Sequence, residues 1–254
     1  MLQTLKRRKL TFIPLLALAT LVVAVGTWHY QARHPDDAQI EQWGVLAGVQ
    51  DEAAISALRT AATDGSKLAS RALGQVLIRR SDEASVKDGQ RWLQHAAEAG
   101  DARASLLLGK LLLKGGPGVT ADALSARPWL EAAVKGGQPG GAHYLGLIYR
   151  QDLPGQTRAP QKAVYWLEVA ATAGFADSQF LLGQMLLSGD GVAPDIDRAR
   201  TWFEAAATQD HPEANLELLM AYRRNDLGLK HSTEAQARQW MEAEHSLRHR
   251  PDAP

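Results

Sequence analysis

The stretch KAVYWLEVAATAGFADSQFLLGQMLLSGDGVAPDIDRARTW, residues 162–202, decides the fold. Ala163, Trp166 and Ala170 lie three and four positions apart, so they share one face of a helix and predict a first helix with an apolar seam. Gly174 comes eight positions after the tryptophan. It predicts the end of this helix, because glycine takes the left-handed conformation without a Cβ penalty. The apolar stretch ADSQFLLGQMLL then predicts a second helix.

The same pattern recurs along the chain. Tryptophans in the first-helix position are separated by 37, 37, 36 and 38 residues, at Trp92, Trp129, Trp166, Trp202 and Trp240. Ala57 takes the tryptophan position in one further copy upstream, and a Leu-Gly pair recurs in the second helix, as in Leu182-Gly183. Chains with such periods are arrays in which each unit buries its apolar face against its neighbours. The sequence therefore predicts an all-α solenoid of about five helix-turn-helix repeats.

The period also predicts the domain organisation of residues 40–250. The repeats are expected at about 51–86, 87–123, 124–160, 161–196 and 197–233. A half-repeat cap is expected at each end, because a terminal repeat would otherwise expose its stacking face to water. The N-terminal cap, 40–50, reads as a lone second helix with Trp43-Gly44 in the Leu-Gly place, and residues 234–250 read as a lone first helix.

Glycine inside the second helices predicts close packing. A glycine there costs about 0.5–1 kcal/mol relative to alanine, so its recurrence requires a neighbouring backbone or a tryptophan ring laid over the missing side chain. Pro128 precedes Trp129. Since proline is tolerated only near a helix start, we expect the first helix of the third repeat to begin close to Pro128, without a long turn before it.

These columns resemble the Sel1-like repeat, a relative of the tetratricopeptide repeat, in its membrane-anchored bacterial type. The family pattern is matched at Ala163, Trp166, Ala170, Ala171, Gly174, Leu182, Gly183, Gly189, Gly191, Val192 and Asp195. Ser178 stands in the second Ala place and Leu186 in the Tyr place. The resemblance covers about residues 51–246. It implies a right-handed α-α superhelix whose first helices line the concave face, and a role in binding.

The N-terminal segment predicts a membrane anchor. Residues 10–28 contain no ionisable side chain and as a helix would reach about 28 Å, close to the ~30 Å hydrocarbon core. The basic tail 1–9 precedes them, which predicts a cytoplasmic N-terminus and, after a linker at 29–39, a periplasmic repeat domain on the bacterial inner membrane. A cleaved secretory signal is the alternative, because residues 17–19 and 24–26 offer small side chains for a signal peptidase.

Composition and motifs exclude several functions. The absence of cysteine excludes disulfides and thiol catalysis. Of the 28 basic residues, Lys6, Arg7, Arg8 and Lys9 precede the apolar segment, which leaves 24 against 28 acidic residues. Such a balance gives no reason to expect a nucleic-acid partner. No nucleophile elbow, phosphate loop or zinc-protease motif occurs, so we expect neither an enzyme nor a cofactor.

Two histidines near the C-terminus are candidate metal ligands. His245 and His249 lie four apart on a predicted helix, a spacing that can hold a transition metal with Glu242 or Asp252 as a third ligand. A solvated capping helix explains the same residues, and we predict no metal site.

One column predicts a binding surface. Glu131, Glu168 and Glu204 each follow a tryptophan by two positions, which turns them by about 200° away from the core. Stacked repeats would align them, together with Tyr165, into an acidic stripe for a partner. The alternative is that glutamate is simply a good exposed helix former.

The sequence thus favours a scaffold or adaptor on the outer face of the inner membrane that binds a protein partner of the cell envelope. The alternative is a cell-wall or polysaccharide-binding accessory factor of an envelope enzyme complex, with a glycan as its partner.

Overall fold

The computed structural model describes residues 35–153 and 157–224, and in addition residues 227, 238, 240–242 and 245. The helices within these ranges are α2 (Asp37–Gly48), α3 (Glu52–Thr63), α4 (Lys67–Leu77), α5 (Glu83–Glu98), α6 (Ala102–Lys114), α7 (Ala123–Lys135), α8 (Gly140–Arg150), α9 (Pro160–Thr172), α10 (Ala176–Ser188), α11 (Ile196–Ala207) and α12 (Pro212–Arg224). The all-α prediction is confirmed.

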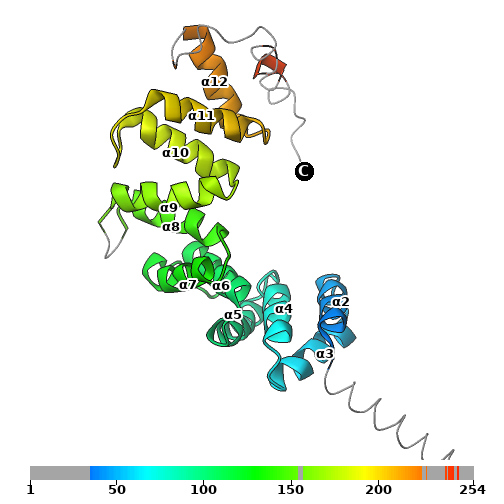
Figure 1. The fold of residues 1–254 in the computed structure, drawn as a ribbon. Helices are drawn as coiled ribbons and strands as arrows, with labels where there is room; N and C mark the ends of the chain where they lie inside the picture. The colour runs from blue at the N-terminus through cyan, green and yellow to red at the C-terminus, as the bar shows by residue number, and fades with distance from the viewer. Residues whose placement is uncertain are drawn as a thin grey trace, which may run out of the picture.

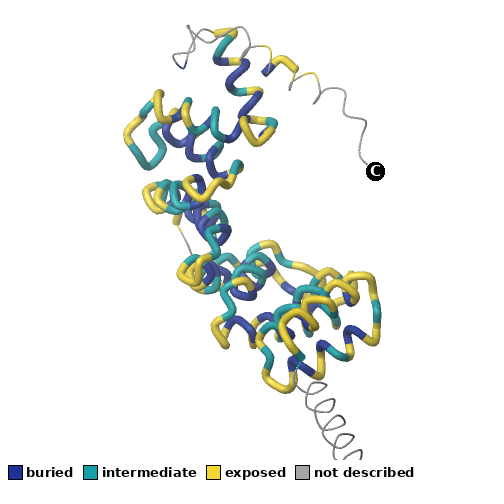
Figure 2. The backbone as a smooth tube through the Cα atoms, turned by 45° about the vertical axis from the view of Figure 1, so that its right-hand side comes forward, coloured by how far each residue is buried: buried dark blue, intermediate teal, exposed yellow. Residues whose placement is uncertain are grey.

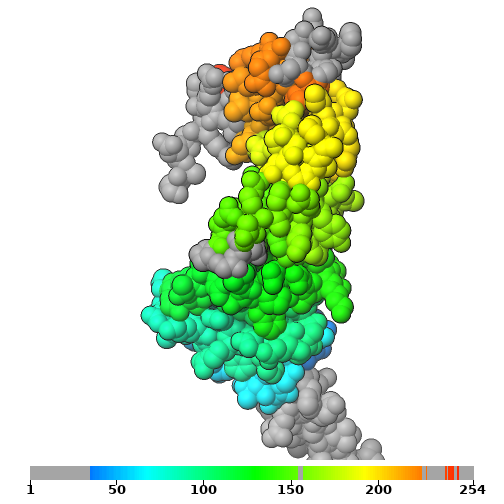
Figure 3. Space-filling model, turned by 90° about the vertical axis from the view of Figure 1, so that its left-hand side faces the viewer, coloured from blue at the N-terminus to red at the C-terminus, as the bar shows by residue number. Residues whose placement is uncertain are grey.

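The helices stack in chain order into one curved, elongated array, with α2 and α3 at one end and α12 at the other (Figure 1). After α2 they form the pairs α3/α4, α5/α6, α7/α8, α9/α10 and α11/α12. Each second helix from α4 to α10 packs more extensively on the first helix of the following pair than on its own partner. The predicted solenoid of stacked helix pairs is therefore confirmed, and its extended outline is visible in Figure 3.

Aspartate caps begin most of these helices. The side chains of Asp51, Asp101 and Asp195 accept hydrogen bonds from the backbone N–H three residues later, at 3.0, 2.8 and 3.0 Å. Such caps satisfy one of the free donors of a helix start. Because the cap precedes each first apolar turn, it fixes where each helix enters the stack.

The glycine column ends the first helices as predicted. Gly65, Gly100, Gly137 and Gly174 have φ of 95°, 84°, 84° and 92°. Asp210 stands at this position in the last repeat and still adopts a positive φ of 58°. The turn therefore keeps its left-handed conformation even where the sequence departs from glycine.

The deepest column of the core follows the tryptophans by one position. Leu93, Leu130, Leu167 and Phe203 are fully buried, whereas the tryptophans beside them are half-buried. A Cβ atom on Gly146 would lie 2.6 Å from Cγ of Leu167, and one on Gly183 would lie 2.7 Å from Cε1 of Phe203. The predicted close packing over these glycines is confirmed, but this next-residue column provides it rather than a tryptophan ring. Figure 2 shows the buried segments running along the array between outward-facing exposed ones.

The N-terminal cap packs differently from the expected half-repeat. Helix α2 contacts both α3 and α4, and it buries Ile40 and Ala47. Trp43 is only half-buried, and a Cβ on Gly44 would have a single near neighbour, Cβ of Ala72 on α4, at 3.6 Å. The expectation that Trp43-Gly44 takes the Leu-Gly place was wrong, because the helix turns this glycine toward α4 instead of α3.

The expectation for Pro128 was also wrong. Helix α7 begins at Ala123, five residues before the proline, and Asp122 caps it through Leu124 and Ser125. Proline removes the hydrogen bond to the carbonyl four residues earlier. That carbonyl belongs to the exposed Leu124, where water can replace the missing donor.

No helix within residues 35–153 and 157–224 has the length and apolar character needed to cross a membrane. The predicted anchor at 10–28 and the basic tail at 1–9 lie outside the described residues. So does most of the C-terminal cap helix predicted at 234–250, although Trp240 is buried and lies edge-on to Tyr222 of α12.

Candidate partner-binding groove

The two layers of the solenoid differ in how closely their helices approach. In the second-helix layer α2 contacts α4, α4 contacts α6, and α6 contacts α8. Among the described residues no two first helices are in comparable contact. Helices of one layer approach each other on the inner side of a curved array, so the second helices form that inner side. The expectation that the first helices line the concave face is corrected accordingly.

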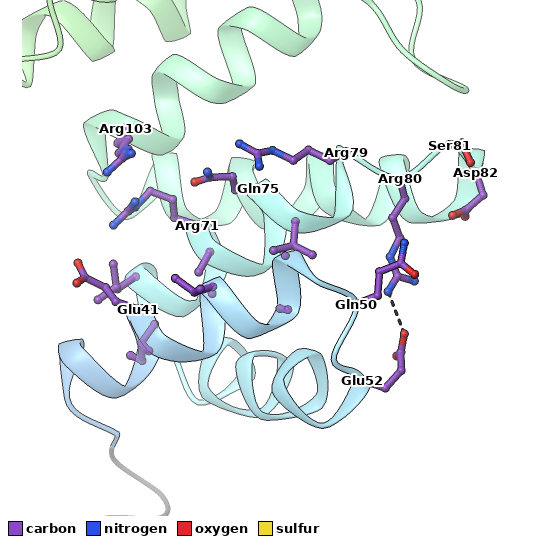
Figure 4. Close-up of a pocket in the computed structure, with 18 residues that line it drawn as sticks. Glu41, Gln50, Glu52, Arg71, Gln75, Arg79, Arg80, Ser81, Asp82 and Arg103 are labelled. Atoms are coloured by element: carbon purple, nitrogen blue, oxygen red, sulfur yellow. Dashed lines mark hydrogen bonds and ion pairs between the residues drawn. The ribbon is translucent and has the colours of Figure 1, made fainter. Parts of the chain in front are cut away.

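A groove of about 830 Å³ lies in the inner layer between α2, α4 and the start of α6 (Figure 4). Its lining includes the small or apolar residues Gly44, Ala72 and Val76. Gly44 of α2 lies opposite Ala72 of α4, where a Cβ on the glycine would be 3.6 Å from Cβ of the alanine, so the two helices approach closely and short side chains line this part of the groove. Val45, which also lines the groove, is 73% exposed.

One side of the groove is lined by cationic and polar side chains. Arg71 and Gln75 stand four residues apart on one face of α4, and Arg79 follows in the turn just beyond the end of that helix. Arg103 reaches the groove from α6. The groove therefore combines apolar contact area with hydrogen-bond donors, which is how binding sites set affinity and orientation.

Two of the groove arginines are neutralised by partners. Nε of Arg71 donates to Oδ2 of Asp101 at 2.9 Å, and both side chains are largely buried. Arg80 pairs with Glu52 at 3.0 Å, as Figure 4 marks. Arg79 and Arg103, in contrast, are exposed and form no ion pair with any described residue.

Carboxylates also border the groove. Glu41 lies on the α2 side, and Asp82 lies beyond the end of α4. Hydrogen bonds from the backbone and side chain of Ser85 hold the pKa of Asp82 below its ordinary value of 3.8. Asp82 is therefore ionised at neutral pH, and the rim carries both signs of charge.

The predicted acidic stripe lies in the first-helix layer, away from this groove. Glu131 stands on α7, Tyr165 and Glu168 on α9, and Glu204 on α11. Oε1 of Glu168 accepts from Arg198 at 2.8 Å, and the carboxylate of Glu131 lies 3.9 Å from Arg127 of its own helix. Tyr165 is 58% exposed, and its ring lies edge-on to that of Trp166. The structure therefore does not bring these residues into the groove.

Two ion pairs at the position of the glutamate column join successive repeats. Arg59 stands in this column in the first repeat and pairs with Asp88 at 2.8 Å. Asp88 precedes its tryptophan by four positions, as Arg198 does in the pair with Glu168. The two ion pairs join equivalent positions of successive repeats, but the basic and acidic residues are exchanged between them. Glu168 therefore has a binding partner within the solenoid.

A second polar cluster continues the inner layer at α8. Nδ1 of His143 lies 2.8 Å from Oγ of Ser178, and burial lowers the pKa of His143 below its ordinary 6.5. The ammonium groups of Lys110 and Lys114 lie 5.4 and 6.0 Å from the ring centroid of Tyr144.

The described residues contain no cluster of three side chains suited to a metal ion. His245 is exposed, whereas His249 and Asp252 lie outside the residues that the structure describes. The hypothetical histidine site is therefore not placed by the structure.

The sequence analysis missed the groove residues Arg79 and Arg103. A signal for Arg79 was present in the sequence, because polar residues recur every four positions at Arg71, Gln75 and Arg79, and the pattern continues past the end of α4 into the turn that holds Arg79. The groove itself depends on how α2 meets α4, which the repeat period does not encode for a half-repeat.

Comparison with known proteins agrees with this architecture. A family model described as Sel1 repeat matches residues 83–101, 102–138, 139–175 and 176–211. Its units from 102 onward join a second helix to the first helix that follows, which is also the more extensively packed pairing. No curated protein matches the chain.

The solved structures similar to the chain include the following two. The crystal structure of a Sel1 repeat protein from Oxalobacter formigenes has a TM-score of 0.69 at 24% identity, over 83% of this chain and 88% of that one. The protective antigen c5321 of uropathogenic Escherichia coli, described as displaying an SLR fold, has a TM-score of 0.47 at 19% identity, over 88% of this chain and 66% of that one. The similarity to the Oxalobacter formigenes protein supports the fold. The similarity to c5321 is too low to support a structural conclusion.

Proposed function

The chain belongs to the Sel1 repeat family, whose members are generally non-catalytic binding scaffolds, and we propose that it is a scaffold or adaptor that holds a protein partner in its inner groove. The groove between α2 and α4 carries the proposal, because it offers apolar surface beside two arginines that have no ion pair within the described chain. The mechanism is display and binding without covalent chemistry.

Affinity capture with two matched variants tests this function. Full-length tagged chain is purified from membranes as the wild type, as Gln75→Trp, which fills the groove, and as a triple variant with Glu131, Glu168 and Glu204 changed to lysine. We expect the groove-filled variant to lose the proteins that the wild type captures and the triple variant to keep them. Loss only in the triple variant would move the site to the first-helix layer, and no specific capture by the wild type would refute the scaffold.

We further propose that residues 10–28 anchor the protein in the bacterial inner membrane, with the repeat domain in the periplasm. The solenoid itself is proposed to be a right-handed superhelix of about five repeats. The run without ionisable side chains and the preceding basic cluster support this membrane topology. N-terminal sequencing of the mature protein is the test. An intact N-terminus in the membrane fraction is expected, whereas a start at Thr20 or Thr27 would show that the segment is a cleaved signal.

A further inference from the structure

We infer that the groove takes an acidic amphipathic helix of the partner, an inference that rests on the proposed function and specifies its ligand. Two of the four groove arginines already have a carboxylate partner within the chain: Arg71 pairs with Asp101 in a largely buried contact, and Arg80 pairs with the exposed Glu52. The positive charge left for a ligand is that of Arg79 and Arg103. Guanidinium groups form strong, bidentate hydrogen bonds with carboxylates, so acidic side chains are the complementary chemistry.

The spacing of the two arginines sets the spacing of the acidic residues. Arg71 pairs with Asp101, the N-cap of α6, and Arg103 is the second residue of that helix. Figure 4 accordingly shows Arg103 near Arg71, with Arg79 farther away, just beyond the C-terminal end of α4. The stretch of helix from Arg71 to the end of α4 at Leu77 spans about 9 Å at 1.5 Å per residue, and Arg79 lies two residues beyond that end. Carboxylates about seven residues apart on one face of a partner helix span about 10 Å, which long glutamate and arginine side chains can bridge.

The apolar surface of the groove favours a helix over an anion alone. Val45 is largely exposed although it lines the groove, and Ala72 and Val76 beside it are half-exposed. An amphipathic helix that lies between two helices covers such residues with its apolar face. Glu41 and Asp82 also lie on the rim, so the partner helix is expected to carry its acidic residues at the two arginines and neutral or basic residues beside these carboxylates.

A peptide titration tests this ligand. The probe is a labelled helical peptide with leucines and two glutamates about seven residues apart on one face, and its matched control carries glutamine in place of both glutamates. Fluorescence anisotropy is measured with the full-length chain in mild detergent, as the wild type and as Arg79→Gln, Arg103→Gln and the double variant. Lys135→Gln on α7 is the control, because it removes one exposed positive charge outside the groove.

We expect the wild type to bind the glutamate peptide about tenfold more tightly than the glutamine peptide, and each arginine variant to weaken binding about three- to tenfold. Added salt weakens the same contacts, and Lys135→Gln binds as the wild type does. Equal affinity for the two peptides, no binding, or equal effects of Arg79→Gln and Lys135→Gln would overturn the proposal. Binding to phosphatidylglycerol vesicles in place of the peptide would also overturn it and assign the arginines to lipid.

The result separates this inference from the function on which it rests. If Gln75→Trp abolishes capture of partners but the acidic peptide does not bind, the ligand chemistry is wrong and the scaffold stands. If Gln75→Trp leaves capture unchanged, the groove itself is refuted, whatever the peptide does.

Discussion

Asp101 has two roles at the junction of α4 and α6. Its Oδ1 accepts from the backbone N–H of Ala104 as the N-cap, and its Oδ2 accepts from Arg71 of the preceding repeat. Both side chains of this ion pair are largely buried. A single carboxylate thus fixes where a helix begins and how it is oriented toward its neighbour, and it also holds one groove arginine in place.

Substitution of Asp101 separates the two roles. Asp101→Ala is expected to lower the free energy of unfolding by about 2–5 kcal/mol, because it removes the cap and leaves the largely buried Arg71 without its carboxylate. Asp101→Asn keeps the cap but also removes this carboxylate, and it is expected to lose about 1–3 kcal/mol. Asp51→Ala, which removes a cap only, is the control, and urea unfolding followed by circular dichroism is the measurement. Equal losses for the two Asp101 variants would show that the cap contributes nothing.

His143 makes the stability depend on pH. Burial is the main cause that lowers its pKa below 6.5, the nearby Lys114 and Lys110 act in the same direction, and Asp177 opposes them. The unfolded chain therefore binds more protons than the folded chain, and stability is complete above pH 6.5 and falls as the pH drops below that value. We expect His143→Gln to flatten this part of the profile in chemical unfolding. An unchanged slope would show that other groups cause the dependence.

At the scale of the helix, the second-helix glycines explain why the array stacks so closely. A Cβ at Gly74, Gly109, Gly146 or Gly183 would come within 2.6–2.7 Å of a leucine or phenylalanine side chain of the next repeat. Each of these positions therefore exchanges helix propensity, about 0.5–1 kcal/mol, for close packing between repeats. The same contact accounts for the extensive packing of each second helix on the next first helix.

Larger residues at two of these positions test that packing. Gly146→Leu and Gly183→Leu are each expected to destabilise the fold by about 2 kcal/mol or more, because overpacked cores force side chains and backbone to shift. Gly44→Ala is the control, since its Cβ would meet only Ala72 at an ordinary 3.6 Å; it is expected to be neutral or slightly stabilising. Thermal unfolding gives the comparison, and unchanged midpoints in the two leucine variants would remove the packing explanation.

At the scale of the whole molecule, the repeat period was enough to predict helix pairs, their left-handed turns and the solenoid. Those features depend on contacts that recur with the sequence columns, such as the next-residue column packed on the second-helix glycines. The inner face and the groove were not predicted, because curvature sums many small rotations between repeats. The packing of α2 could not be predicted from the repeat pattern either, because no complete repeat precedes this helix. Its Gly44 faces α4 instead of the first helix that follows.

The glutamate column also shows that a recurring residue predicts exposure but does not predict which contacts each copy makes. Its recurrence predicted exposure correctly for Glu131, which is exposed on α7, but Glu168 is paired with Arg198 across a repeat boundary. Ion pairs between repeats depend on which residue lies opposite, and the equivalent position is occupied by Asp88 in one repeat and by Arg198 in another. A column of like charges is therefore insufficient to locate a binding surface.

Site-specific photo-crosslinking in living cells tests the central claim, that partners bind the inner layer, most directly. A photoreactive amino acid is placed in the full-length chain at Gln75 in the groove or, in a matched variant, at Glu131 in the first-helix layer. We predict a discrete crosslinked protein from Gln75 and none from Glu131. A crosslinked partner from Glu131 alone, or from neither position, would contradict the account.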